Sequence, residues 1–241
     1  MNAIVVTNLT KKYGNSVAVD NLNLLIEQGE LFALLGTNGA GKTTTIKMLS
    51  CLIPPTCGDA VLLNNSINRH SQEVKQTINL SPQETAVAAN LSVLENLVFI
   101  AEIYGESKEA SRRKAKETIS QFSLDNALSK KARTLSGGMQ RRLSIAMALI
   151  TNPQILFLDE PTLGLDVIAR RELWALIKAL KGKVTIILTT HYLDEVEALA
   201  DRIGVMKDGV LVTAGTVAEL MRQTETTKFE DAFITLAGGV L

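Results

Sequence analysis

The chain has 241 residues, and its 25 basic and 25 acidic side chains cancel to a formal net charge of zero at pH 7. A balanced charge gives no net field that would attract nucleic acid or an anionic membrane, so we expect no nucleic-acid partner. Hydrophobic residues make up 46% of the chain, which is ordinary for a globular protein and excludes a disordered one.

The first third of the chain predicts strands followed by a strand–loop–helix unit. The predicted strands cover residues 4–9, 22–26 and 31–35. The third of these is a continuous apolar run, as expected for a buried strand, and it ends at Gly36. Helical spacing follows over residues 43–52, before the Pro54-Pro55 pair.

Residues 84–131 are rich in Ala, Glu, Lys and Leu and show little strand signal, with helices expected to start at Ser92 and Ser107. The alternating pattern returns after Pro153, with predicted strands at 155–158 and 184–188, helices at 169–180 and 193–200, and a hairpin over 202–212. Strands that alternate with helices predict an α/β fold with a mostly parallel sheet. We expect one domain over 1–241, with 1–83 and 151–241 as its core and 84–150 as an inserted helical subdomain.

No signal peptide or membrane-spanning run is evident, and we expect a cytosolic chain. Cys51 and Cys57 are too few for a disulfide scaffold and lack nearby metal ligands, so they are interpreted as reduced thiols.

The loop after the third predicted strand matches the phosphate-binding pattern G-x-x-x-x-G-K-[ST] at every specified position. Its residues are Gly36, Thr37, Asn38, Gly39, Ala40, Gly41, Lys42 and Thr43, followed by Thr44. The glycines allow successive backbone N–H groups to face the phosphates. Lys42 is predicted to reach the β- and γ-phosphates, and the Thr43 hydroxyl to bind Mg²⁺. We therefore predict an ATP site.

Two carboxylates, Asp159 and Glu160, follow the buried strand at 155–158. Alone, such a pair is more often a solvated turn; beside a phosphate-binding loop it favours catalysis. Asp159 would hold Mg²⁺ through water, and Glu160 would deprotonate the attacking water. His191 follows another apolar strand and is predicted to contact the γ-phosphate. Tyr13 has two open interpretations, as an adenine-stacking ring or as a surface aromatic.

A second anion site is predicted at Ser136-Gly137-Gly138, which lead directly into a segment with helical spacing. One chain thus carries two phosphate-binding loops about a hundred residues apart.

These motifs, in this order, resemble the nucleotide-binding subunit of an ATP-binding-cassette (ABC) transporter. The resemblance covers residues 4–236 and rests on the first phosphate loop, Gln83, the LSGGM segment at 135–139, the Asp159-Glu160 strand, the LGLD segment ending at Asp166, and His191. It implies a P-loop NTPase (RecA-like) core with an N-terminal antiparallel β part. The implied ligands are ATP and Mg²⁺.

The resemblance also implies roles for single residues. Tyr13 would stack on adenine, and Gln83 would touch Mg²⁺ or the attacking water and sense a membrane permease. The signature loop, Ser136-Gly137-Gly138, would bind the γ-phosphate of ATP held by a second nucleotide-binding subunit, identical or related. The two subunits would form a head-to-tail dimer, and Asp166 would cross the dimer interface. The implied catalytic residues are Glu160, His191, Gln83 and Lys42.

Further expectations concern coupling and class. Residues 84–104 are expected to dock an integral membrane permease, which places the subunit peripherally on the cytoplasmic side of the cell membrane. Residues 228–239 resemble the end of ABC-2 type exporter subunits, which favours export over import. Met139 and Leu163-Gly164 depart from common family residues but remove no charged catalytic group. The alternative is a soluble ABC-type ATPase of repair or ribosome function; only some ninety residues separate the two loops, too few for a long coiled coil.

Overall fold

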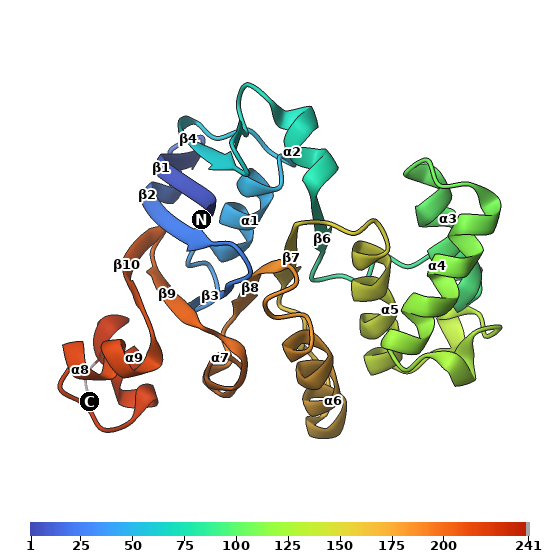
Figure 1. The fold of residues 1–241 in the computed structure, drawn as a ribbon. Coiled ribbons are helices and arrows are strands. Elements are labelled where there is room, and N and C mark those ends of the chain that lie inside the picture. The colour runs from blue at the N-terminus through green and yellow to red at the C-terminus, as the bar shows by residue number, and fades with distance from the viewer. Residues whose placement is uncertain (240–241) are drawn as a thin grey trace.

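The fold, given by a computed structural model that describes residues 1–239, contains two sheets (Figure 1). An antiparallel sheet of order β2-β1-β4-β5 comprises β1 (Asn2–Tyr13), β2 (Ser16–Glu27), β4 (Cys57–Leu62) and β5 (Asn65–Ser66). The second, of order β10-β9-β3-β8-β7-β6, comprises β3 (Leu31–Gly36), β6 (Ile78–Ser81), β7 (Ile155–Asp159), β8 (Thr185–Thr190), β9 (Arg202–Lys207) and β10 (Val210–Gly215). Only β10 pairs antiparallel in this second sheet, which confirms the predicted α/β class.

Helices surround the six-stranded sheet. They are α1 (Lys42–Leu49), α2 (Ser71–Thr77), α3 (Val93–Ile103), α4 (Lys108–Gln121), α5 (Gly137–Leu149), α6 (Val167–Lys178), α7 (Leu193–Leu199), α8 (Val217–Gln223) and α9 (Phe229–Leu236). Figure 1 shows α3 and α4 on the far side of α5 from the sheet. Ser92 and Ser107 cap α3 and α4 as predicted, each side chain accepting a backbone N–H three residues later.

The core has two layers, one on each face of the six-stranded sheet. Side chains of a strand alternate between faces. In β3, Leu31, Ala33 and Leu35 therefore pack with α5 and α6, whereas Phe32 and Leu34 pack with the antiparallel sheet and α1. All six residues of β3 are buried, so the phosphate loop that follows it starts from a rigid base.

Several helix ends lie one to three residues from the predicted positions, and two of these differences have a clear local cause. The helix expected over 43–52 ends at Leu49 because Cys51 adopts φ 56°, and its N–H bonds back to the Met48 carbonyl. The helix expected at 169–180 begins earlier, at Val167, because the Asp166 carboxylate caps it. Over residues 1–239, no helix combines the length and apolar character needed to cross a bilayer.

Candidate active site

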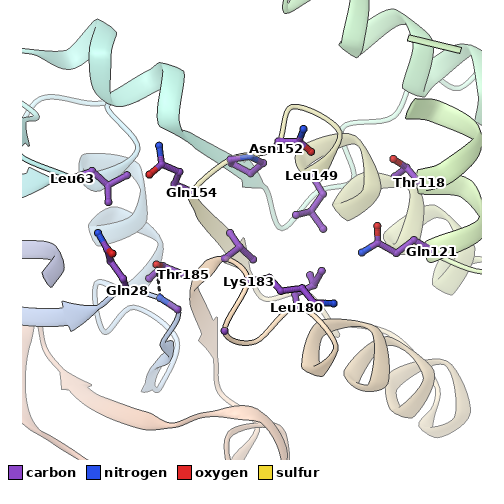
Figure 2. A pocket seen from close by; sticks show the side chains of 14 residues that line it. Gln28, Leu63, Thr118, Gln121, Leu149, Asn152, Gln154, Leu180, Lys183 and Thr185 are labelled. Atoms are coloured by element: carbon purple, nitrogen blue, oxygen red, sulfur yellow. Dashed lines mark hydrogen bonds between the residues drawn. The ribbon is translucent and has the colours of Figure 1, made fainter. Parts of the chain in front are cut away.

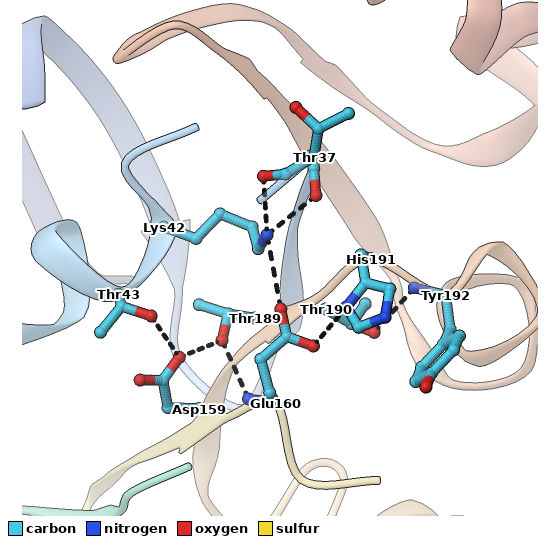
Figure 3. Close-up of polar contacts among 10 residues, drawn as sticks. Thr37, Lys42, Thr43, Asp159, Glu160, Thr189, Thr190, His191 and Tyr192 are labelled. Carbon is cyan, nitrogen blue, oxygen red and sulfur yellow. Dashed lines mark hydrogen bonds and ion pairs between the residues drawn. The ribbon is translucent and has the colours of Figure 1, made fainter. Parts of the chain in front are cut away.

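Three neighbouring parallel strands bring the predicted chemical groups to one edge of the sheet. Leu35 of β3 lies beside Thr190 of β8, and Asp159 of β7 lies beside Thr189. The carboxyl ends of β3, β7 and β8 are therefore level, and ligands bind at such ends in open α/β sheets. Figure 3 shows Lys42, Asp159, Glu160 and His191 converging there from separate segments.

The phosphate loop needs its glycines because its backbone lies against other backbone. Gly41 has φ 98°, and a Cβ there would collide with the Ala18 carbonyl oxygen. A Cβ at Gly36 would likewise meet the Met206 carbonyl oxygen. The loop can therefore leave β3 and enter α1 in a tight turn that directs the first N–H groups of α1 outward.

Lys42 is buried, and its ammonium group is held by the loop itself. Its Nζ donates to the Gly36 carbonyl oxygen at 2.8 Å and the Thr37 carbonyl oxygen at 3.2 Å. The Glu160 Oε1 atom lies 3.4 Å from the same nitrogen (Figure 3). The ammonium thus stands between the loop and the Glu160 carboxylate, where the sequence predicts the γ-phosphate.

Asp159 lies beneath the loop and is reached through Thr43. The Thr43 hydroxyl donates to Asp159 Oδ1 at 3.0 Å, and the Thr189 hydroxyl donates to the same oxygen at 2.5 Å. No group of three or more His, Cys, Asp or Glu side chains in residues 1–239 forms a metal cage. A carboxylate and a hydroxyl beside a phosphate loop fit Mg²⁺, which is bound by few carboxylates together with substrate phosphates.

Glu160 occupies a strained backbone position. Its φ is 47°, a left-handed conformation that costs a non-glycine residue about 1–3 kcal/mol. Two acceptors hold its N–H, the Thr189 carbonyl oxygen at 3.1 Å and the Thr189 hydroxyl at 3.0 Å. The carboxylate is 7% exposed, and its Oε2 lies 2.8 Å from His191 Nδ1. The strain thus aims a buried carboxylate at the space above the phosphate loop.

These groups border a cavity of about 400 Å³. It is lined by Ala18, Asn38, Gly39, Ala40, Gly41, Lys42, Thr43, Thr44, Gln83, Glu160, Leu163 and His191. The predicted nucleotide-binding residues 38–44 therefore line one cavity, and Gln83 faces them from the segment after β6. Gly36, Thr37 and Asp159 lie behind the lining, and Tyr13, whose side chain is 51% exposed, is not part of it.

The signature loop and Asp166 lie outside this cavity. Ser136 caps α5, its hydroxyl accepting the Met139 N–H at 3.3 Å, and Ser136 and Gly137 are exposed. Asp166 caps α6 by accepting the N–H groups of Ile168 and Ala169, both at 2.9 Å. The chain does not fold residues 136–138 over its own phosphate loop.

Sequence reasoning missed Arg141 and Thr189. Arg141 of α5 is 5% exposed and donates to the backbone carbonyls of Pro82, at 2.7 Å, and Gln83. Burial lowers the pKa of its guanidinium, while the charges of Asp159 and Glu195 act in the opposite direction. No sequence signal distinguishes a buried arginine from the exposed arginines usual on a helix. Thr189 could have been assigned to the site from the sequence, because it lies at a strand end directly before Thr190-His191.

A larger cavity, of about 540 Å³, opens at the opposite edge of the sheet (Figure 2). Its walls include Gln154 and Thr185 at the starts of β7 and β8, and Thr118 and Gln121 from α4. Amide and aliphatic side chains dominate this lining, with Lys183 as its one charged member. It lacks the carboxylate, ammonium and imidazole groups gathered at the other edge.

The chain matches known proteins along almost its whole length. Residues 19–163 match the family model described as ABC transporter. The doxorubicin resistance ATP-binding protein DrrA of Mycobacterium tuberculosis is 38% identical, over 99% of this chain and 76% of its own. A solved structure described as the ATP-binding subunit of an ABC transporter aligns with a TM-score of 0.86 at 26% identity, covering 97% of this chain and 99% of the other. The ATP-binding cassette MJ0796, solved as a dimer in a post-hydrolysis state bound to ADP and Pi, aligns with a TM-score of 0.80 at 29% identity, covering 88% and 98%.

Proposed function

The chain belongs to the ABC transporter family, and we propose that it is the ATP-hydrolysing subunit of an exporter, acting on an integral membrane permease. It is an ATP-binding ATPase with a P-loop NTPase fold. The observation that carries the proposal is the Glu160 carboxylate, held between Lys42 and His191 at the phosphate loop. The resistance function in the name of the M. tuberculosis relative supports export rather than import.

Each catalytic group has a part in the proposed mechanism. The N–H groups of residues 36–44 and the Lys42 ammonium bind the phosphates and offset their charge. Glu160 accepts a proton from the attacking water, and His191 fixes the orientation of that carboxylate through its Nδ1. Thr43 and Asp159, with Gln83, would hold Mg²⁺, which polarises phosphate oxygens when bound.

The second phosphate loop supports a site shared between two subunits. Ser136 and Gly137 present the exposed N-terminus of α5, outside the chain's own cavity. In a head-to-tail dimer, this loop would close over the ATP of the partner, with Asp166 at the contact. Loss of the γ-phosphate would then remove contacts to both subunits and allow the dimer to open.

Crosslinking between two introduced cysteines, in a chain whose native cysteines are replaced by serine, tests the shared site. Cysteines are placed at Thr37 in one chain and Met139 in another, in a background with Cys51→Ser, Cys57→Ser and Glu160→Gln, and a short thiol crosslinker is added. A covalent dimer is expected with Mg·ATP and at most a trace without nucleotide, because closure is a bimolecular association driven by ligand. Equal crosslinking without ATP, or none under any condition, refutes the shared site.

Exposed apolar side chains on α3 and at its C-terminal end support docking of the permease near residues 84–104. Phe99, Ile103 and Tyr104 are each more than half exposed, and Ala88 and Ala89 lie on the surface just before them. We propose that this face binds the permease and holds the subunit at the cytoplasmic side of the membrane, with residues 84–150 acting as one helical subdomain.

Charge substitutions test this docking face. Ala88→Glu and Ala89→Glu are expected to leave basal ATPase activity unchanged and to abolish co-purification with the permease; Ser120→Glu, on the exposed side of α4, serves as the control. An ATPase that never co-purifies with a membrane protein would favour the alternative, a soluble ABC-type ATPase not coupled to transport.

A further inference from the structure

A polar cluster lies behind Glu160, in the protein interior. In residues 1–239, four buried side-chain polar atoms have no hydrogen-bond partner. Three of them, Thr162 Oγ1, Arg170 Nε and Glu195 Oε2, belong to this cluster. Buried polar atoms are almost always paired, so three unpaired atoms in one place need a reason.

Glu195, on α7, is the centre of this cluster. Its side chain is fully buried, and its Oε1 accepts the indole N–H of Trp174, on α6, at 3.0 Å. Burial raises the pKa of this carboxyl, against the opposing effect of the neighbouring Thr190, Trp174 and Thr162 side chains. Glu195 does not line the nucleotide cavity, so any effect on catalysis must pass through its neighbours.

Two of those neighbours are joined directly to the catalytic groups. Thr162 lies two residues after Glu160, and Thr190 immediately precedes His191. Both threonines are buried, and the Thr190 hydroxyl accepts the backbone N–H of Tyr192 at 3.0 Å. The Glu195 carboxyl therefore lies near both the segment that carries the general base and the segment that carries its histidine.

Helix α6 joins the same cluster through Arg170 and Trp174. The Arg170 guanidinium lies over the Trp174 ring at 5.3 Å and the Tyr192 ring at 5.4 Å, and bonds Asp194 at 3.0 Å. The Tyr192 ring is 4.1 Å from the His191 ring. Because α6 begins at the Asp166 cap, the cluster ties the predicted dimer contact to the catalytic histidine.

We propose that Glu195 is a positioning residue for ATP hydrolysis, which fixes Glu160 and His191 relative to each other through Thr162, Thr190 and the Arg170–Trp174 pair. The unpaired donor and acceptor atoms leave the cluster able to form further hydrogen bonds. This role rests on the proposed function, because it concerns the same reaction.

Steady-state kinetics give the first test. The variants are Glu195→Ala, which removes the carboxyl, and Glu195→Gln, which keeps the shape and one acceptor oxygen for Trp174. Glu197→Gln, on the exposed side of the same helix, is the matched control. We expect kcat to fall about tenfold or more in Glu195→Ala, since small misplacements of catalytic groups are costly. Glu195→Gln should recover part of this loss. The KM for ATP should stay within about twofold of wild type in all variants, since no residue of the cluster lines the nucleotide cavity.

Trp174 provides a direct spectroscopic signal because it is the single tryptophan of the chain. We expect its fluorescence to change on Mg·ATP binding to Glu160→Gln, and this change to be lost when Glu195→Ala is added. If Glu195→Ala does not fold, Trp174→Phe, which removes only the N–H donor, and Glu195→Gln carry the kinetic test.

A wild-type kcat in folded Glu195→Ala overturns the proposal, as does a wild-type kcat in both Glu195→Gln and Trp174→Phe. A rise in the KM for ATP that accounts for the whole loss of activity also overturns it. A wild-type chain without ATPase activity refutes the proposed function instead. Active wild type with unaffected Glu195 variants refutes only the role of Glu195.

Discussion

The two glycine-containing loops that precede α1 and α5 have opposite surroundings. The first lies against its own chain: Lys42 bonds two loop carbonyls, and Glu160 and His191 face it across a cavity. The second is exposed, and its serine makes only the hydrogen bond that caps its own helix. The first loop is therefore organised against groups of its own chain, whereas the second lies exposed at the surface.

The glycines of the two loops differ in how closely the rest of the chain packs against them. Gly36 and Gly41 have no room for a Cβ beside the backbone of Met206 and Ala18. Gly138 also has an internal reason, since a Cβ there would lie 2.9 Å from the Ala169 Cβ. A Cβ at Gly137 would meet nothing closer than Leu165, at 4.0 Å. The packing of this chain does not demand Gly137, which fits a position that an external phosphate approaches closely.

The largest effect is expected in the first loop's site. Glu160→Gln should lower kcat by about 10²- to 10⁴-fold, because it removes the general base, while ATP still binds. The variant should accumulate a dimer with Mg·ATP, measured by size-exclusion chromatography, whereas Glu117→Gln, on the surface of α4, should behave as wild type. Wild-type turnover in Glu160→Gln would exclude it as the base.

The next prediction concerns Arg141, which joins α5, the helix after the second loop, to the backbone of Pro82 and Gln83. Arg141→Gln should lower the free energy of unfolding by about 1.5–3 kcal/mol, because the carbonyls of Pro82 and Gln83 lose a charged donor. Its neighbour Arg142 reaches only the exposed Glu172, at 3.6 Å, so Arg142→Gln should cost about 1 kcal/mol or less. Urea denaturation measures both, and equal losses would show that the buried contacts add nothing.

The residues around the first loop could be predicted from the sequence better than the strands and buried side chains that hold them in place. Motif residues at the ends of β3, β7 and β8 could be assigned because buried apolar runs locate strand ends, and parallel strands end together. Strands β4 and β6 were not predicted, since Cys57–Leu62 and Ile78–Ser81 are short and lack a continuous apolar run. The inward placement of Arg141 and Glu195 depends on packing between distant elements, and local periodicity carries no information about it.

A pair of glycine substitutions separates internal from external requirements in the second loop. Gly137→Ala should keep the melting temperature at or above the wild-type value, because alanine favours helix and meets no clash. It should nevertheless lower the ATPase rate about tenfold, or about 1.4 kcal/mol, by obstructing the partner's phosphate. Gly138→Ala should instead lower the melting temperature through overpacking against Ala169. Thermal denaturation and ATPase assays distinguish the two, and full activity in Gly137→Ala would argue against a phosphate at this loop.

The smallest expected effect comes from a pair of serine substitutions, which tests whether Ser136 does more than cap α5. Ser107 caps α4 with the same geometry, since each hydroxyl accepts a backbone N–H three residues later at 3.3 Å in an exposed position. Ser136→Ala and Ser107→Ala should therefore lower the free energy of unfolding by similar amounts, about 1 kcal/mol each. Only Ser136→Ala should also weaken the ATP-dependent dimer, measured in the Glu160→Gln background as the protein concentration at half association. Because the loss of cap energy is matched, any difference in association belongs to a contact outside the chain; equal association in the two variants would leave Ser136 as a helix cap alone.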